Sequence, residues 1–331
     1  VADASLNWSA FSSQLTTKVN ELRVVDTGAA ASQSFTFLQV QPLTAFLNIP
    51  NTGIGNVVES VVLNGSVNSK TFIYANAIQI DSPIDAGSSN VDLQIPSGTL
   101  SITANVSGAN VKAIALGGSL SVSSQVNGTS SATFNAANDI TTSGAILGGS
   151  VDLTSQSGNI TTAGTVGSVG GGSINYSTPA GNILIAGGIA GSGFLSLSAS
   201  TSNTIAINSA VSTTANVSVD SFAAFTVTSG GSLTGGRFVT ISTTAGNVTL
   251  AGSVSADRTT GTLQILGPYS NSAVLNMTGT LAANDLVVFA TTTSAPLALS
   301  TNVTRVWGQT GNNLSINNSK GLDRKSTRLN S

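Results

Sequence analysis

The side chains that usually carry catalysis are few and scattered in this sequence. The chain has no histidine and no cysteine, so imidazole acid–base chemistry and thiolate chemistry are both missing. Sugar-cleaving enzymes on β-helical scaffolds need clustered carboxylates. Asp139 immediately precedes Ile140, whereas Asp152 falls in a different predicted strand, so they form no pair. The remaining candidate acids are equally isolated: Asp220, Asp257 and Asp285. The sequence therefore predicts no catalytic, cofactor or metal site.

Two local motifs have a chemical and a structural interpretation. Gly170-Gly171-Gly172-Ser173 is similar to a phosphate-binding loop, but no helical pattern follows it, which favours a flexible corner. Asn-x-Ser/Thr occurs about a dozen times and is a possible glycan acceptor. Because Asn, Ser and Thr are so abundant, chance explains most of these matches. They include Asn105, Asn127, Asn159, Asn175, Asn216, Asn247, Asn276 and Asn302.

The strongest pattern is a pair of apolar residues six positions apart that returns every 20–23 residues. A fixed period of this length is typical of a solenoid, in which each repeat stacks on its neighbours. The pairs are Ile78/Ile84, Leu100/Val106, Leu120/Val126, Ile140/Ile146, Ile160/Val166, Ile183/Ile189, Ile205/Val211, Val227/Leu233 and Val248/Val254, followed by Leu275/Leu281 and Leu297/Val303.

Inside each repeat, apolar residues alternate with polar ones, as they do on strands with one buried side. Leu100-Ser101-Ile102 begins one face, a second starts at Val106, and Val111-Lys112-Ala113 forms a third. Three short strands per repeat predict an all-β fold, a right-handed parallel β-helix with triangular coils over residues 61–318. One inward ladder should contain Ile140, Ile160, Ile183, Ile205, Val227 and Val248.

The corner after the first face almost always carries a small residue. A sharp corner between two strands needs a residue without a bulky side chain, often at positive φ. Length differences between repeats should collect between the second and third faces. The corner residues are Ala104, Ser124, Gly144, Gly164, Gly187, Ser209, Gly231, Gly252 and Gly279.

Charge is unusually scarce. Only 7% of the residues are charged, and no Lys or Arg lies between Lys112 and Arg237. Either Ser, Thr and Asn simply solvate the faces, or weak self-repulsion allows rods to lie side by side or end to end. The net charge of −2 gives no support for nucleic-acid binding. No apolar run is long enough for a membrane span.

The N-terminal part resembles a known export domain. Leu6-Asn7-Trp8-Ser9-Ala10-Phe11, Phe35–Pro42, Thr44–Asn48 and Val61–Gly65 are similar to motifs of the haemagglutination-activity domain of filamentous-haemagglutinin-like exoproteins. Ala75-Asn76-Ala77 stands where that family has N-P-N-G. The resemblance implies a secreted β-helical adhesin or filament, exported with an outer-membrane partner.

The two ends are predicted to differ from the repeats. Residues 1–60 should form a cap continuous with the solenoid, and residues 319–331 resemble translated adapter sequence and should be a non-native or disordered tail. Val1-Ala2-Asp3 suggests a mature chain whose signal peptide has been removed.

We therefore expect a non-enzymatic, extracellular or cell-surface structural protein. It would be a filament or sheath subunit that associates with itself through its ends or faces. The alternatives are a monomeric adhesin rod that binds cell-surface glycans and a carbohydrate-active β-helix enzyme. Trp8 and Trp307 would either cap the core or form subunit contacts. The proposed contacts are Trp8, Phe11, Phe35, Phe37, Val306, Trp307, Leu314 and Ile316.

Overall fold

The described part of the chain is a parallel β-solenoid of about ten turns. The computed structural model describes residues 83–88, 90–95, 97–269, 273–290, 297–310 and 314–319. Outside these ranges it describes only strands: β1 (Leu22–Arg23), β2 (Gln33–Phe37), β3 (Leu47–Asn48), β4 (Val58–Leu63), β5 (Thr71–Tyr74), β6 (Ile78–Ile80) and β36 (Arg328–Asn330). The chain divides into two compact units, residues 1–154 and 155–331.

The first unit contains short strands and strands that turn a corner. β10 (Val106–Ala115) pairs with β7 (Ile84–Asp85) through its first residues and with β8 (Val91–Ile95) through its last, so one strand serves two faces. It pairs with β12 (Val126–Ala136) along both faces, with a register shift between Gly108 and Asn110. The remaining strands are β9 (Gly98–Ile102), β11 (Gly118–Val122), β13 (Ile140–Thr142) and β14 (Ile146–Ser155).

The second unit repeats a cycle of three strands, one for each face of the coil. The first face contains β15 (Ile160–Thr162), β18 (Ile183–Ile185), β21 (Thr204–Ile207), β24 (Ala224–Val227), β27 (Val248–Leu250) and β30 (Leu275–Met277). The second contains β16 (Val166–Ser168), β19 (Ile189–Gly191), β22 (Ala210–Thr213), β25 (Ser232–Thr234), β28 (Ser253–Ser255) and β31 (Thr280–Ala282). The third contains β17 (Ile174–Thr178), β20 (Leu195–Ala199), β23 (Val217–Ser221), β26 (Phe238–Thr243), β29 (Thr262–Leu266), β32 (Asp285–Ala290) and β34 (Arg305–Thr310). β33 (Leu297–Asn302) and β35 (Leu314–Asn318) pair with each other.

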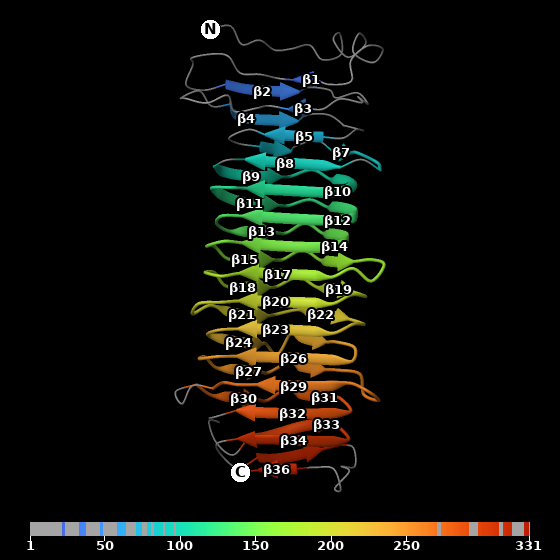
Figure 1. Cartoon of the computed structure of the whole chain (residues 1–331), viewed down its shortest axis with the longest axis vertical. Coiled ribbons are helices and arrows are strands. Elements are labelled where there is room, and N and C mark those ends of the chain that lie inside the picture. Colours follow the sequence, from blue (N-terminus) through green and yellow to red (C-terminus); the bar gives the residue numbers. More distant parts are fainter. Residues whose placement is uncertain are drawn as a thin grey trace. The chain divides into compact units, whose positions relative to one another are not determined.

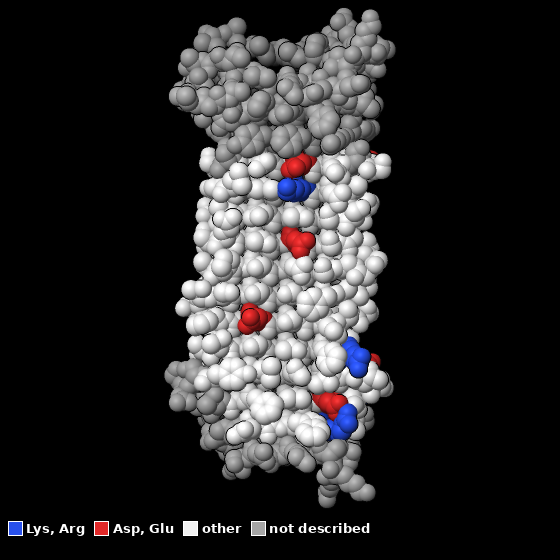
Figure 2. All heavy atoms as spheres, viewed as in Figure 1, with Lys and Arg blue, Asp and Glu red and all other residues white. Residues whose placement is uncertain are grey.

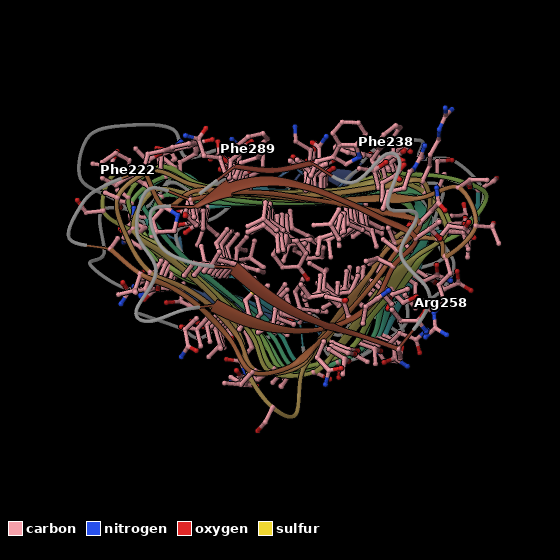
Figure 3. The ribbon with its side chains drawn as sticks, turned by 90° about the horizontal axis from the view of Figure 1, so that it is seen from below. Phe222, Phe238, Arg258 and Phe289 are labelled. Atoms are coloured by element: carbon pink, nitrogen blue, oxygen red, sulfur yellow. The ribbon has the colours of Figure 1, made fainter. Side chains whose placement is uncertain are left out.

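The coil has the predicted hand and section. In Figure 1 the third-face strands run leftward in front while the chain descends, which is the right-handed sense. Viewed along the axis, the coils outline a triangle, and stacked side chains fill its interior (Figure 3). The hand agrees with the right-handed preference of parallel crossover connections.

The core consists of ladders of apolar side chains, as the alternation predicts. Leu195, Val217 and Val239 lie in register on adjacent third-face strands, and each is buried. The outward neighbours Ser196, Ser218 and Thr240 form a parallel polar row. Each coil therefore buries its apolar side only because another coil stacks on it.

One position of the predicted inward ladder is wrong. Ile160, Ile183 and Ile205 are in register, but the next residue in this ladder is Phe225, not Val227. Val227 points inward in the neighbouring ladder, opposite Ile207.

The cause is a longer corner after β24. Thr228, Ser229, Gly230 and Gly231 form a turn that is closed by a bond from the Gly231 amide to the Thr228 carbonyl at 2.9 Å. The six-residue spacing from Val227 to Leu233 is real, but it starts from the second inward residue of the strand. Both inward residues are apolar, so spacing alone cannot distinguish them.

The second-face ladder also differs from the prediction at its C-terminal end. Thr301, not Val303, stands opposite Leu281. The Thr301 hydroxyl is buried and donates to Asn318 Oδ1 at 2.8 Å, which satisfies it there. A polar residue with an internal partner has replaced the apolar residue that the period predicts.

Small residues occupy the corner after the first face, but not because of the backbone angle we expected. None of the positive-φ glycines of the described residues lies at this corner. Instead, a Cβ on Gly144, Gly187, Gly252 or Gly279 would lie 1.9–2.1 Å from the carbonyl oxygen of the equivalent residue in the preceding coil. Close stacking of coils, rather than left-handed backbone, therefore requires these glycines.

Candidate functional surface

The isolated acids of the sequence remain apart in the structure. In the first unit, Asp139 precedes the first-face strand β13, whereas Asp152 lies on the third-face part of β14. In the second unit, Asp220 lies on β23 and Asp285 begins β32, three coils later on the same face. Asp285 forms a two-point ion pair with Arg305 of β34. Within the described ranges, no three potential metal-binding side chains of the His, Cys, Asp and Glu types come together.

Two acidic groups have perturbed protonation for structural reasons. Asp257 Oδ1 accepts bonds from the hydroxyls and amides of Thr259 and Thr260, which hold the pKa of this exposed carboxyl far below its usual range. All of these bonds are formed within the loop between β28 and β29. Partial burial raises the pKa of Asp92, and the charge of Lys112 on the adjacent strand opposes this effect. Each perturbation is explained by local contacts.

The glycine run at residues 170–172 is a corner, as predicted. Gly170 and Gly171 have φ angles of 69° and 84° and join β16 to β17. The Gly171 amide donates to the hydroxyl of Ser192 at 2.9 Å. A strand follows the run, so the helix N-terminus that completes a phosphate-binding loop is replaced by sheet.

The core of the second unit contains one aromatic hydroxyl. Tyr176 is wholly buried on the inward side of β17, and its Oη has no hydrogen bond within the usual geometric limits. Burial raises the pKa of Tyr176, and the nearby Thr162 side chain opposes this shift. The phenol therefore stays neutral in the core and serves as a packing residue.

Several of the Asn-x-Ser/Thr sites belong to a ladder that joins successive coils. Each of these asparagines immediately precedes a strand, and its side-chain oxygen accepts the amide of the equivalent residue in the next coil. Asn159 accepts from Asn182 at 2.9 Å, and Asn182, which is not itself an Asn-x-Ser/Thr site, accepts from both the amide and the hydroxyl of Thr204 at 2.9 Å. Asn105, Asn216 and Asn247 make the corresponding bonds. This role of the asparagines needs no glycan. It could have been predicted from the sequence, because each of these asparagines stands directly before a predicted strand.

We expect Asn182→Ala to lower the free energy of unfolding by about 1 kcal/mol, because the amide and hydroxyl of Thr204 lose their acceptor. The matched control is Asn276→Ala, at an exposed position on the outer side of β30, with an expected change below about 0.5 kcal/mol. Urea unfolding followed by circular dichroism measures both. Equal urea midpoints for the two variants would show that the asparagine ladder does not contribute to stability.

The outer surfaces of the second unit differ sharply in charge. Among the described residues, its first and second faces and the corner between them carry no charged side chain. The charged groups lie on the third face and at its leading corner: Asp220, Arg237, Asp257, Arg258, Asp285 and Arg305. Figure 2 looks onto the third face and shows that even there charged side chains are few, standing singly or as pairs of opposite sign in a neutral surface.

The outward residues of the third face change from polar to mostly apolar toward its C-terminal coils. On β17, β20 and β23 its outward residues are polar: Asn175, Ser177, Ser196, Ser198, Ser218 and Asp220. On β29, β32 and β34 four of the six equivalent positions are apolar, namely Leu266, Val287, Phe289 and Trp307, and the other two hold Gln264 and Gln309. Phe289 lies along the same side as Phe222 and Phe238, and all three rings point outward (Figure 3). We call Leu266, Val287, Phe289 and Trp307 the apolar patch.

The predicted assembly residues have different locations. Val306 is fully buried in the core, whereas Trp307 is 36% exposed on the outer side of β34, in register with Val287. Trp307 therefore belongs to a lateral face rather than to a cap over the core. Trp8 and Phe11 lie outside the described residues, as do the side chains of Phe35, Phe37, Leu314 and Ile316.

Sequence reasoning missed Leu266, Val287 and Phe289. The signal was present, because Leu286-Val287-Val288-Phe289 is apolar at both inward and outward positions and so breaks the alternation.

Within the described residues, no helix is long and apolar enough to cross a membrane. Comparison of the chain with protein-family models, with curated proteins and with solved structures finds no match.

Proposed function

We propose that this chain is a non-enzymatic structural protein of an extracellular surface, a subunit that assembles side by side with its own copies into a filament or sheath. The observation that carries this proposal is the absence of charged side chains from two whole faces of the second unit among the described residues. Soluble proteins generally keep copies apart with charge of one sign on their surfaces. Here Ser, Thr, Ala and Asn side chains cover the faces and leave little repulsion to overcome.

The geometry of these faces suits lateral contact. Their strands stack in register, so their outward side chains form straight rows, such as Ala206, Thr226 and Thr249. Small side chains make such rows shallow, which lets two faces approach closely. A contact of this kind is weak for one pair of coils and gains strength because it repeats along the stack.

The extracellular location is the part of the proposal that rests on resemblance. Residues 6–78 are similar to the export domain of filamentous-haemagglutinin-like proteins, which deliver β-helical chains to the cell surface. The same resemblance supports a second candidate, a monomeric adhesin rod. Exposed rings on the third face are also compatible with that candidate, because exposed apolar groups can bind other molecules as well as copies of the same chain.

We expect Thr161→Lys/Thr226→Lys, which adds two charges to the first face, to reduce the assembled fraction at least fivefold. Like charges would then face each other at every lateral contact. The control is Ser196→Lys/Ser218→Lys, which adds the same charges to outward positions of the third face, outside the apolar patch. Negative-stain microscopy and sedimentation of the full chain give the readout, and circular dichroism checks folding.

Ordered assemblies of the wild type that the first-face lysines disperse and the control lysines leave intact would support the subunit function. Single particles of the wild type at every concentration would reject it and leave the adhesin rod. Equal dispersal by both lysine pairs would also reject assembly through the first face.

A further inference from the structure

The apolar patch is a contiguous surface on three neighbouring strands. Leu266 lies in register with Phe289 across β29 and β32, and Val287 lies in register with Trp307 across β32 and β34. The two aromatic side chains remain 42% and 36% exposed. Neighbouring strands in a sheet are about 4.8 Å apart, so these four side chains cover one unbroken area.

The fold does not require apolar residues at these positions. In the preceding coils the same outward rows hold Ser242 and Asp220 in line with Leu266, and Thr240 and Ser218 in line with Val287. The inward residues of the same strands, including Leu263, Leu286 and Val306, form the core without help from the outer side. Exposed apolar area that adds nothing to the core commonly marks a surface that another molecule covers.

We propose that the apolar patch binds the same patch of a second copy of this chain, through a two-fold contact between third faces. The proposal rests on the self-assembly proposed above and names one surface that would contribute to it. In such a contact each residue meets its counterpart or a neighbour of it, so one apolar surface is enough for both partners.

The composition of the patch favours a protein partner over a sugar. Sugars stack on aromatic rings, but here the rings alternate with the branched aliphatic side chains of Leu266 and Val287. Aliphatic and aromatic groups together are typical of the dry centre of a protein interface, and tryptophan is enriched among the residues that dominate its affinity. The geometry therefore points to a protein surface of the same kind.

On β29, β32 and β34 the rim of the patch is polar and carries no net charge, whereas Arg328 of β36 stands in register with Trp307 on the next strand. Gln264 and Gln309 border it on β29 and β34. The Asp285–Arg305 ion pair lies at the leading ends of β32 and β34, so its two charges cancel at the edge. The residues of β29, β32 and β34 therefore add little charge repulsion between two copies, because Asp285 and Arg305 neutralise each other.

The size of the surface is compatible with a weak or moderate dimer. Exposed patches of this type cover a few hundred Å², whereas a standard interface needs about 800 Å² per partner. The patch can supply the apolar centre, and the polar rows around it can supply the remainder. We therefore expect a concentration-dependent equilibrium rather than a permanent dimer.

The test compares the full chain with Phe289→Ser/Trp307→Ser. Serine occupies equivalent outward positions in earlier coils, so this variant should fold. The control is Phe194→Ser/Phe222→Ser, which removes two rings of similar exposure, 43% and 38%, at corners outside the patch. Sedimentation velocity over a wide concentration range should give a dimer dissociation constant at least tenfold weaker for the patch variant and within twofold for the control.

The possible results separate this inference from the proposed function. Larger assemblies that form equally well with the patch variant would overturn the inference and leave the function intact. Dimers that depend on the patch, without any larger assembly, would support the inference and reject the function. A wild-type chain that stays monomeric would overturn the dimer, and its Trp307-dependent retention on a neutral polysaccharide column would then assign the patch to glycan binding.

Discussion

Ile183→Asp is expected to unfold the second unit at temperatures where the wild type remains folded. Ile183 is 1% exposed and lies between Ile160 and Ile205 in the first-face ladder. An aspartate there would either bury a charge without a partner or take up a proton in the core. Either event costs several kcal/mol, which is a large share of the stability of an ordinary domain.

The damage should spread along the stack. In a solenoid each coil obtains much of its stability from the interfaces with its two neighbours, so the coils that contain Ile160 and Ile205 lose part of their support as well. Hydrogen exchange should therefore show reduced protection on β15, β18 and β21 together. Protection lost only on β18 would contradict this coupling.

The matched control is Leu184→Asp, one residue away on the same strand. Leu184 points outward and is partly exposed, so an aspartate there stays hydrated and should change stability by about 0.5 kcal/mol or less. Thermal unfolding followed by circular dichroism compares the two variants. If both melt at the same temperature, the inward and outward sides of this strand have been assigned incorrectly.

Gly246→Ala should have the second large effect, although it adds only one methyl group. A Cβ at Gly246 would lie 1.2 Å from the carbonyl oxygen of Ala223 in the preceding coil, and 2.0 Å from the carbonyl carbon. Neither atom can move alone, because both belong to a stacked backbone. We expect the two coils to separate locally, at a cost of about 3 kcal/mol in the free energy of unfolding.

The control for this steric argument is Gly230→Ala, in the turn after β24. The nearest atom to a Cβ at Gly230 is the Asn208 carbonyl oxygen at 3.7 Å, an ordinary contact. This substitution should leave stability unchanged, or raise it by about 0.4–1 kcal/mol, because alanine restricts the unfolded chain. Urea midpoints measure both variants. Similar midpoints would show that the coils near Gly246 are not packed as closely as described.

The repeated apolar spacing was enough to predict the fold class. Each coil must point its apolar residues inward and turn at three corners, so positions such as Ile183, Leu195 and Val211 recur at fixed intervals in the sequence. All three are buried in the structure, on three different faces. The period identified the inward-pointing residues, because every coil must bury one side of each of its strands.

Details of register needed the tertiary structure. Phe225 and Val227 are both inward and apolar, and only the backbone pairing with Ile205 and Ile207 shows which ladder each one joins. The reason is that stacking depends on the path of the adjacent coil, including a turn whose length the spacing does not reveal. The same holds for Gly246, where the restriction comes from Ala223, more than twenty residues earlier.

The candidate surface was decided almost entirely by tertiary structure. Sequence alone pointed to Trp307 but not to the residues that form the apolar patch with it. The reason is that Leu266, Phe289 and Trp307 are about twenty residues apart along the chain. Parallel pairing of β29, β32 and β34 converts that separation into adjacent strands. Where apolar and polar residues alternate along a strand, the sequence by itself determined which side chains face inward; on β32, which is apolar on both sides, it did not. Which outward side chains meet was determined by the stacking of one coil on the next.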